Sequence, residues 1–125
     1  MNRMKPVLLA AMLILPVALY PTGPTAALNA TSSVDSRIRL DWEIGARHGR
    51  PVIQGWVYND YGRAAMDVRL LVETLDASGN VIARDFGFVF GTVGFNDRTY
   101  FEVPLKTTGA SYQVSITAFD WKSGR

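Results

Sequence analysis

The sequence predicts an all-β fold of antiparallel strands joined by tight turns. Apolar and polar residues alternate with a period of two in several segments, and turn-forming residues separate these segments. Beyond the N-terminal stretch, no apolar spacing typical of a helix persists over three turns. Six or seven short strands of this kind favour an antiparallel β-sandwich, with a small closed barrel as the main alternative.

The first 27 residues have the pattern of a cleavable signal peptide. Arg3 and Lys5 give a positive start, residues 7–20 carry no charge, and Thr25-Ala26-Ala27 ends the segment with small residues. The uncharged run is shorter than the roughly 20 residues that a membrane-spanning helix needs. We therefore predict cleavage after residue 27, or as late as residue 30, and a secreted or periplasmic protein with no membrane span. An uncleaved N-terminal anchor is the alternative.

A polar lead-in at residues 28–36 precedes the predicted domain of residues 37–125. Residues 37–44 alternate between apolar and charged side chains, which predicts a half-buried strand. Residues 51–58 predict the next strand, and residues 59–62 predict a turn, since Asn, Asp and Gly tolerate the backbone angles of turns. The side chains expected to face inward are Ile38, Leu40, Trp42, Ile44, Ile53, Gly55 and Val57.

Three further segments alternate in the same way, at residues 66–75, 99–103 and 112–119. Between the first two, residues 76–80 predict a hairpin in which Gly79 takes the position with positive φ, and the return strand begins at residue 81. The side chains expected to share the inner face of the first segment are Met66, Val68, Leu70 and Val72. In the last segment, Tyr112, Val114, Ile116 and Ala118 share one face, and Phe119 lies on the other.

The composition excludes several classes of function. With no cysteine and one histidine, neither a disulfide framework nor a zinc site of Cys, His and carboxylate ligands is expected. Two of the 13 basic residues, Arg3 and Lys5, lie in the predicted signal peptide, which leaves 11 basic against 11 acidic residues. A neutral domain lacks the clustered cations that bind a nucleic-acid backbone. We therefore expect no nucleic-acid partner, no metal and no cofactor.

The candidate catalytic side chains lack the partners that catalysis needs. His48 lies between Arg47 and Arg50 in the sequence, and no G-x-S-x-G turn is present. Asp41 and Glu43 share the outer face of one strand about 7 Å apart, a separation that a glycosidase could use, but outward carboxylates on a strand are usually solvated. The aspartates in the turns do not have the spacing of a calcium loop. We predict that the protein is not an enzyme, and a hydrolase using Asp41 and Glu43 is the remaining catalytic alternative.

Aromatic residues mark two candidate binding surfaces. If Ile53, Gly55 and Val57 point inward, Trp56 and Tyr58 point outward with Tyr61 just beyond the strand, where the rings could grip a protein or a sugar. A strand covered on both faces would instead make these rings structural.

The second candidate surface is residues 86–95, which carry no charge and contain four phenylalanines and three glycines. If this segment is extended, Phe86, Phe88 and Phe90 line one face. We favour a core strand followed by a glycine-containing loop. An exposed edge strand that pairs with another chain is the alternative.

Four segments also carry a family resemblance: the alternating strand at residues 53–59, the strand at residues 68–76 that ends in Asp76, the hairpin at residues 79–82 and Phe101-Glu102-Val103. Together they resemble the FxLYD-type domains, which are small immunoglobulin-like sandwiches of bacterial envelope proteins. The resemblance covers about half of the chain after the predicted signal peptide. It implies an immunoglobulin-like sandwich with an accessory or interaction role, and it transfers no catalytic residue.

These observations together predict a non-enzymatic interaction module that binds another envelope protein or itself. The alternative is a carbohydrate-binding module that stacks sugars on its exposed aromatic rings. The candidate partner-binding residues are Trp56, Tyr58, Tyr61, Phe86, Phe88 and Phe90.

Overall fold

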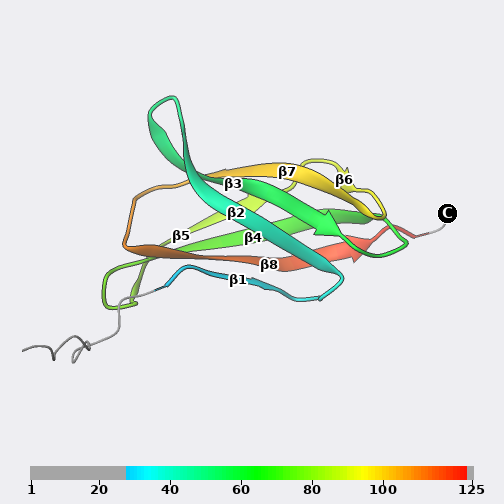
Figure 1. Ribbon diagram of the computed structural model, residues 1–125, viewed down its shortest axis with the longest axis horizontal. Coiled ribbons are helices and arrows are strands. Elements are labelled where there is room, and N and C mark those ends of the chain that lie inside the picture. The colour runs from blue at the N-terminus through cyan, green and yellow to red at the C-terminus, as the bar shows by residue number, and fades with distance from the viewer. Residues whose placement is uncertain (1–27, 124–125) are drawn as a thin grey trace, which may run out of the picture.

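The computed structural model describes residues 28–123, which form two mostly antiparallel β-sheets and no helix (Figure 1). The three-stranded sheet has the order β2 (Ile38–Arg47), β3 (Arg50–Asn59) and β7 (Asp97–Pro104). The five-stranded sheet has the order β1 (Ala30–Ser33), β8 (Ser111–Trp121), β4 (Ala65–Leu75) and β5 (Val81–Phe88), with β6 (Thr92–Val93) also paired to β4. The all-β antiparallel prediction is confirmed, and these residues form two sheets instead of one closed barrel.

The predicted signal peptide at residues 1–27 lies outside the described residues. Within residues 28–123, no helix is long and apolar enough to cross a membrane.

The hydrophobic core lies between the two sheets and follows the predicted alternation in most strands. On β3, Ile53 and Val57 are fully buried, whereas Trp56 and Tyr58 are half-buried on the opposite face, so the predicted register of this strand is confirmed. The other strands supply the remaining core residues, among them Ile38, Leu40, Val68, Leu70, Val72, Phe101, Val103, Val114 and Ile116.

Irregular pairing between β4 and β8 changes the predicted alternation at one end of the five-stranded sheet. The register shifts between Met66 and Arg69, where Asp67 has a φ of 55°. An extra residue in a bulge reverses the facing of the residues beyond it. Met66 is therefore only half-buried, in contrast to the prediction, and the fully buried residue is Ala65. A second shift leaves Phe119, which was predicted to face outward, packed against the core.

The polar segment before residue 37 contains a strand that the alternation did not predict. The strand β1 pairs in parallel with β8, and the indole Nε1 of Trp42 donates a hydrogen bond to Thr31 Oγ1 at 2.8 Å. At the other end of β2, the β2–β3 hairpin projects beyond the body of the sheets (Figure 1). Ile44 pairs with Ile53 near the end of the sheet from which this hairpin projects, and it is 45% exposed, so the prediction that it faces the core is wrong.

Candidate binding surfaces

The structure places the predicted partner-binding residues in three separate places. Trp56 and Tyr58 lie on the outer face of the three-stranded sheet, and Phe86 and Phe88 lie on β5 at the edge of the five-stranded sheet, with Phe90 just beyond its end. Tyr61 lies in the turn after β3. Its ring packs 4.8 Å from that of Trp121, with the Arg37 guanidinium 4.5 Å away, so this side chain belongs to a structural cluster at the end of the molecule.

The phenylalanines of β5 are exposed because the strand turns its small and polar residues inward. Gly87 faces the other sheet, where a Cβ atom would lie 2.6 Å from Val103 Cγ2, and Asp85 is buried beside Lys106. The alternation therefore points Phe86 and Phe88 outward, with exposed fractions of 73% and 56%, and Phe90 is 90% exposed. The favoured prediction of a core strand is wrong, because these phenylalanines are exposed on the side of β5 that faces away from the other sheet.

The backbone of β5 also has a free side. Val89 N donates to Val68 O at 3.0 Å, and hydrogen-bonded and non-hydrogen-bonded residues alternate along an antiparallel pair. The N–H and C=O groups of Phe86 and Phe88 therefore point away from β4. Lys106 Nζ donates to Arg84 O at 3.0 Å, which agrees with this alternation because Arg84 is two residues before Phe86.

A groove runs between β5 and β7, the edge strands of the two sheets. We call it the β5–β7 groove. It has a volume of about 550 Å³, and its apolar lining includes Phe88, Phe90, Phe101 and Pro104. Its polar lining comes from Arg47, Tyr100 and Glu102. The guanidinium of Arg47 donates to both carboxylate oxygens of Glu102, with Nε–Oε1 at 2.6 Å and Nη2–Oε2 at 2.8 Å, which ties the projecting hairpin to β7.

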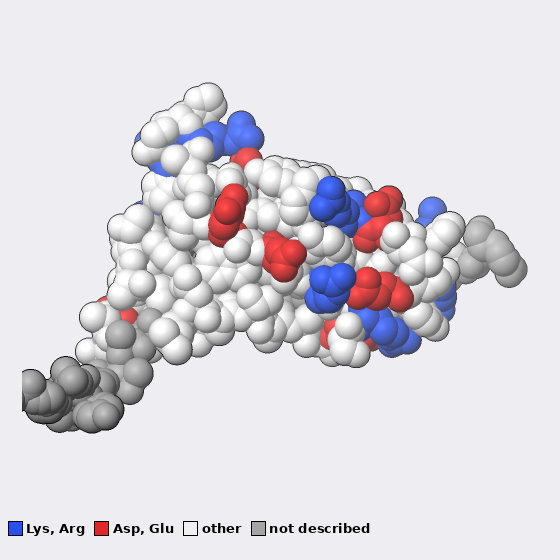
Figure 2. Space-filling view, in the orientation of Figure 1, with Lys and Arg blue, Asp and Glu red and all other residues white. Residues whose placement is uncertain are grey.

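The outer face of the three-stranded sheet combines aromatic rings with charged side chains. We call it the aromatic face. Its outward residues, taken from β2, β3 and β7 in turn, are Arg39, Asp41, Glu43, Gln54, Trp56, Tyr58, Arg98, Tyr100 and Glu102. Acidic and basic side chains are interspersed over this part of the molecule (Figure 2). No single sign of charge dominates it, in agreement with the neutral composition of the domain.

Arginines cover two of the rings on the aromatic face. The Arg98 guanidinium lies 4.1 Å from the Trp56 ring centroid, and that of Arg39 lies 4.4 Å from the ring centroid of Tyr58. Trp56 and Tyr100 meet edge to face, with centroids 5.4 Å apart and an interplanar angle of 69°. Such contacts hold the rings in fixed orientations.

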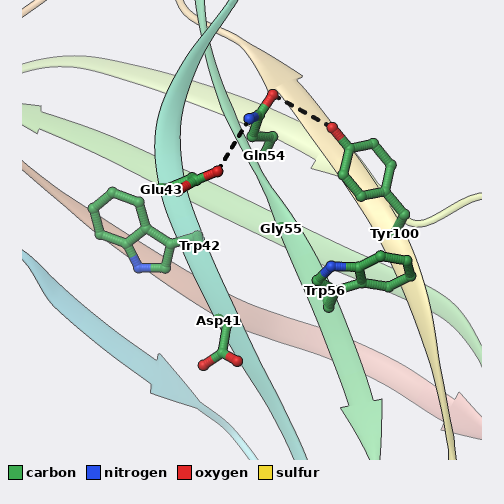
Figure 3. A pocket seen from close by; sticks show the side chains of 7 residues that line it. All are labelled: Asp41, Trp42, Glu43, Gln54, Gly55, Trp56 and Tyr100. Carbon is green, nitrogen blue, oxygen red and sulfur yellow. Dashed lines mark hydrogen bonds between the residues drawn. The ribbon is translucent and has the colours of Figure 1, made fainter.

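Hydrogen bonds connect the polar residues of this face in a row (Figure 3). Gln54 Nε2 donates to Glu43 Oε2 at 3.3 Å, and the hydroxyl of Tyr100 donates to Glu102 Oε2 at 2.8 Å. Hydrogen bonds from Arg47 and Tyr100 lower the pKa of the Glu102 carboxyl, and donation to Glu102 raises the pKa of Tyr100.

A hollow of about 270 Å³ lies on the aromatic face between β2 and β7, and we call it the Gly55 hollow. Its side-chain lining comes from Asp41, Glu43, Gln54, Trp56 and Tyr100, with the backbone of Gly55 between them (Figure 3). A Cβ atom at Gly55 would overlap Asp41 O and lie 2.8 Å from Trp42 Cα, so glycine permits the close approach of β2 and β3.

Sequence reasoning did not select Tyr100 or Gln54 as site residues. The alternation of residues 99–103 places Tyr100 on the face of its strand opposite to Phe101 and Val103. However, only the pairing of β7 with β3 brings it to Trp56, and that pairing cannot be read from the alternation.

Among residues 28–123, the structure places no metal-binding group of side chains around the candidate catalytic residues Asp41, Glu43 and His48. Asp41 and Glu43 do share the outer face of β2, as predicted, but within residues 28–123 no three His, Cys, Asp or Glu side chains are grouped closely enough to hold a metal ion. His48 lies in the exposed turn of the projecting hairpin with a φ of 52°. Asp76 Oδ1 accepts hydrogen bonds from the backbone N–H groups of Ser78 and Asn80, both at 2.9 Å, which lower the pKa of Asp76. This aspartate stabilises the predicted hairpin.

No family model, curated protein or solved structure matches the chain.

Proposed function

We propose that the protein is a non-enzymatic, secreted or periplasmic interaction module that binds another envelope protein through β5. The observation that carries this proposal is the combination, on one edge strand, of exposed Phe86 and Phe88 with free backbone groups, together with exposed Phe90 just beyond the end of the strand. An edge strand of this kind is a template for pairing with a strand of another chain. Natural sheets usually protect such edges with charges or proline, whereas residues 86–95 contain neither.

The partner segment is extended and apolar. Its backbone pairs with the free side of Phe86 and Phe88, and its alternate side chains lie in the β5–β7 groove against Phe90 and Phe101. Main-chain hydrogen bonds supply affinity in this mode, and the groove supplies specificity. A second copy of β5 is the other occupant that this chemistry admits, because residues 86–90 carry no charge that would repel the same residues of another copy.

An immunoglobulin-like sandwich is the fold that suits this role. The two mostly antiparallel sheets with a shared core support it, as does the resemblance of residues 51–103 to the FxLYD-type domains. We extend that family's accessory role to this chain as part of the proposal. The signal-peptide pattern of residues 1–27 supports the export that the role requires.

Photo-crosslinking in the producing cells tests the proposal. A photoreactive phenylalanine analogue at position 90 should give a discrete adduct, and the same analogue at Gln113, which is exposed on β8 of the same sheet, should give none. An adduct at the mass of a dimer identifies a second copy as the occupant. No adduct at position 90, or equal adducts at both positions, would overturn the assignment.

A matched pair of variants at Phe86 separates strand pairing from simple apolar contact. Proline at this position removes an N–H that faces the free side of β5, so Phe86→Pro should abolish the adduct at position 90 while the domain stays folded by circular dichroism. Phe86→Ala keeps the N–H and should retain part of the adduct. Equal adduct yields from the two variants would exclude backbone pairing.

A further inference from the structure

We propose that the Gly55 hollow is a carbohydrate site that takes a neutral glycan. This site lies on the three-stranded sheet and does not depend on the function proposed for β5. Three properties of the hollow favour a sugar. It has an oriented aromatic surface, its carboxylates are free to accept hydrogen bonds, and its volume and the charges of its lining restrict which ligand it can take.

The aromatic surface is Trp56. The Arg98 guanidinium lies 4.1 Å from the Trp56 ring centroid, and Tyr100 packs against the ring edge to face, so the ring is held in one orientation. The ring nevertheless remains half-exposed. The face of an aromatic ring carries a negative quadrupole. The part of the Trp56 ring that Arg98 and Tyr100 leave uncovered lines the hollow, where it can attract the weakly positive C–H groups on the flat side of a pyranose ring. Because Trp56 is already oriented, little side-chain entropy is lost when a sugar stacks on it.

The polar groups around this ring suit sugar hydroxyls. Among the described residues Asp41 has no ion-pair or hydrogen-bond partner, and Glu43 accepts one long hydrogen bond from Gln54 at 3.3 Å. Carboxylates are acceptors, and hydrogen bonds from hydroxyls to a charged acceptor are stronger than those between neutral groups. The Gln54 amide adds a donor. Donors and acceptors close to an aromatic surface match the alternating C–H and O–H groups of a sugar.

Charge and size restrict the class of glycan. Asp41 and Glu43 would repel the carboxylates or sulfates of an acidic glycan, and the Arg98 guanidinium beside Trp56 disfavours a cationic one, so we infer a neutral glycan. The volume of about 270 Å³ is close to the lower limit of about 300 Å³ for small-molecule pockets. The hollow therefore takes a single sugar ring, and further units of a chain lie outside it along the aromatic face.

Heteronuclear NMR of the labelled protein tests this site directly. The probes are hexamers of β-1,4-linked glucose, of N-acetylglucosamine and of mannose, with spermidine as a cationic probe and oligogalacturonate as an anionic one. At least one neutral hexamer should shift the Trp56 indole N–H and the Gly55 amide saturably and leave the Trp121 indole in place. No saturable shift with any neutral hexamer, or a saturable shift with spermidine or oligogalacturonate alone, would overturn the proposal.

Two substitutions in the hollow test whether the sugar binds there. Trp56→Ala should weaken binding at least about tenfold through loss of stacking, and Asp41→Asn should weaken it about fivefold because a neutral acceptor replaces a charged one. Phe86→Ala on the opposite sheet is the matched control and should leave sugar binding unchanged. Binding that survives both Trp56→Ala and Asp41→Asn would place the sugar elsewhere and overturn the assignment.

Discussion

The β5 edge and the aromatic face both present aromatic rings to solvent, but they hold those rings in different ways. On the aromatic face, arginines cover Trp56 and Tyr58. Phe86 on β5 is 73% exposed, Phe90 just beyond the end of β5 is 90% exposed, and the backbone of the strand has a free side. The rings of the aromatic face already contact neighbouring side chains of the domain, whereas those of β5 and the backbone beside them lack such neighbours.

This difference indicates what each surface can bind. A ring oriented by its neighbours loses little entropy when a small rigid ligand stacks on it, which favours a sugar. Exposed phenylalanines on an unpaired edge gain most when a long apolar segment covers them and completes the sheet. We therefore propose that the same residue class binds a small ligand on one sheet and a protein strand on the other.

The largest expected effect comes from changing the glycine that lies on each surface. A methyl group at Gly55 would overlap the β2 backbone, which cannot move alone, so Gly55→Ala should reduce the free energy of unfolding by about 3 kcal/mol or more. At Gly87 the added methyl meets the Val103 side chain, which can adjust, so Gly87→Ala should cost about 1 kcal/mol. Urea unfolding measures both values.

Gly62→Ala is the control for this comparison, because Gly62 has open space around it and its φ is not positive. It should change stability by no more than about 0.5 kcal/mol. Equal losses at Gly55 and Gly87 would show that the two surfaces are equally rigid and would remove the contrast between them.

A smaller effect is expected when one ring is removed from each surface. Trp56→Ala removes contacts with Arg98 and Tyr100 and should cost about 1–2 kcal/mol. Phe90→Ala removes a ring with few contacts in the free domain and should change stability by no more than about 0.5 kcal/mol. Thermal unfolding of the two variants measures this contrast. A large loss at Phe90 would mean that its ring packs in the free domain.

The sequence predicted the strands and most of their facing, because each depends on local alternation. It failed where pairing between distant strands decides the outcome. Bulges between β4 and β8 exchanged the burial of Ala65 and Met66, and only the order of strands in the sheet shows that β5 is an edge. The facing of Phe86 was predictable from alternation, but its exposure was not.

The candidate sites were likewise predictable where one strand decides the facing of a side chain, and unpredictable where the pairing of several strands decides it. Trp56 and Tyr58 were correctly expected to point outward, since one strand is enough to decide this. The Gly55 hollow could not be predicted, because its lining comes from β2, β3 and β7 and depends on their registers. Tyr61 was expected just beyond the strand, on the same aromatic surface as Trp56 and Tyr58, but the turn after β3 directs its ring to Trp121.

The smallest expected effect concerns the link between the two surfaces, where Glu102 accepts hydrogen bonds from Arg47 and Tyr100. These donors lower the pKa of Glu102 in the folded state, so its ionised form stabilises the fold above the unfolded pKa of about 4.3, and this contribution is lost as the pH falls through the lowered folded value. Glu102→Gln should therefore lose less stability than the wild type on acidification below about pH 4.3.

Arg37 holds the pKa of Asp35 at about 2. Asp35 is present in both the wild type and the variant, so its titration does not obscure the difference between the two proteins. The same variant should bring the raised pKa of Tyr100 back toward its usual value of about 10, which ultraviolet titration of the phenolate measures. Parallel acid-unfolding curves together with an unchanged tyrosine titration would show that Glu102 does not hold the row of polar groups together. In that case the projecting hairpin and the aromatic face would be independent of each other.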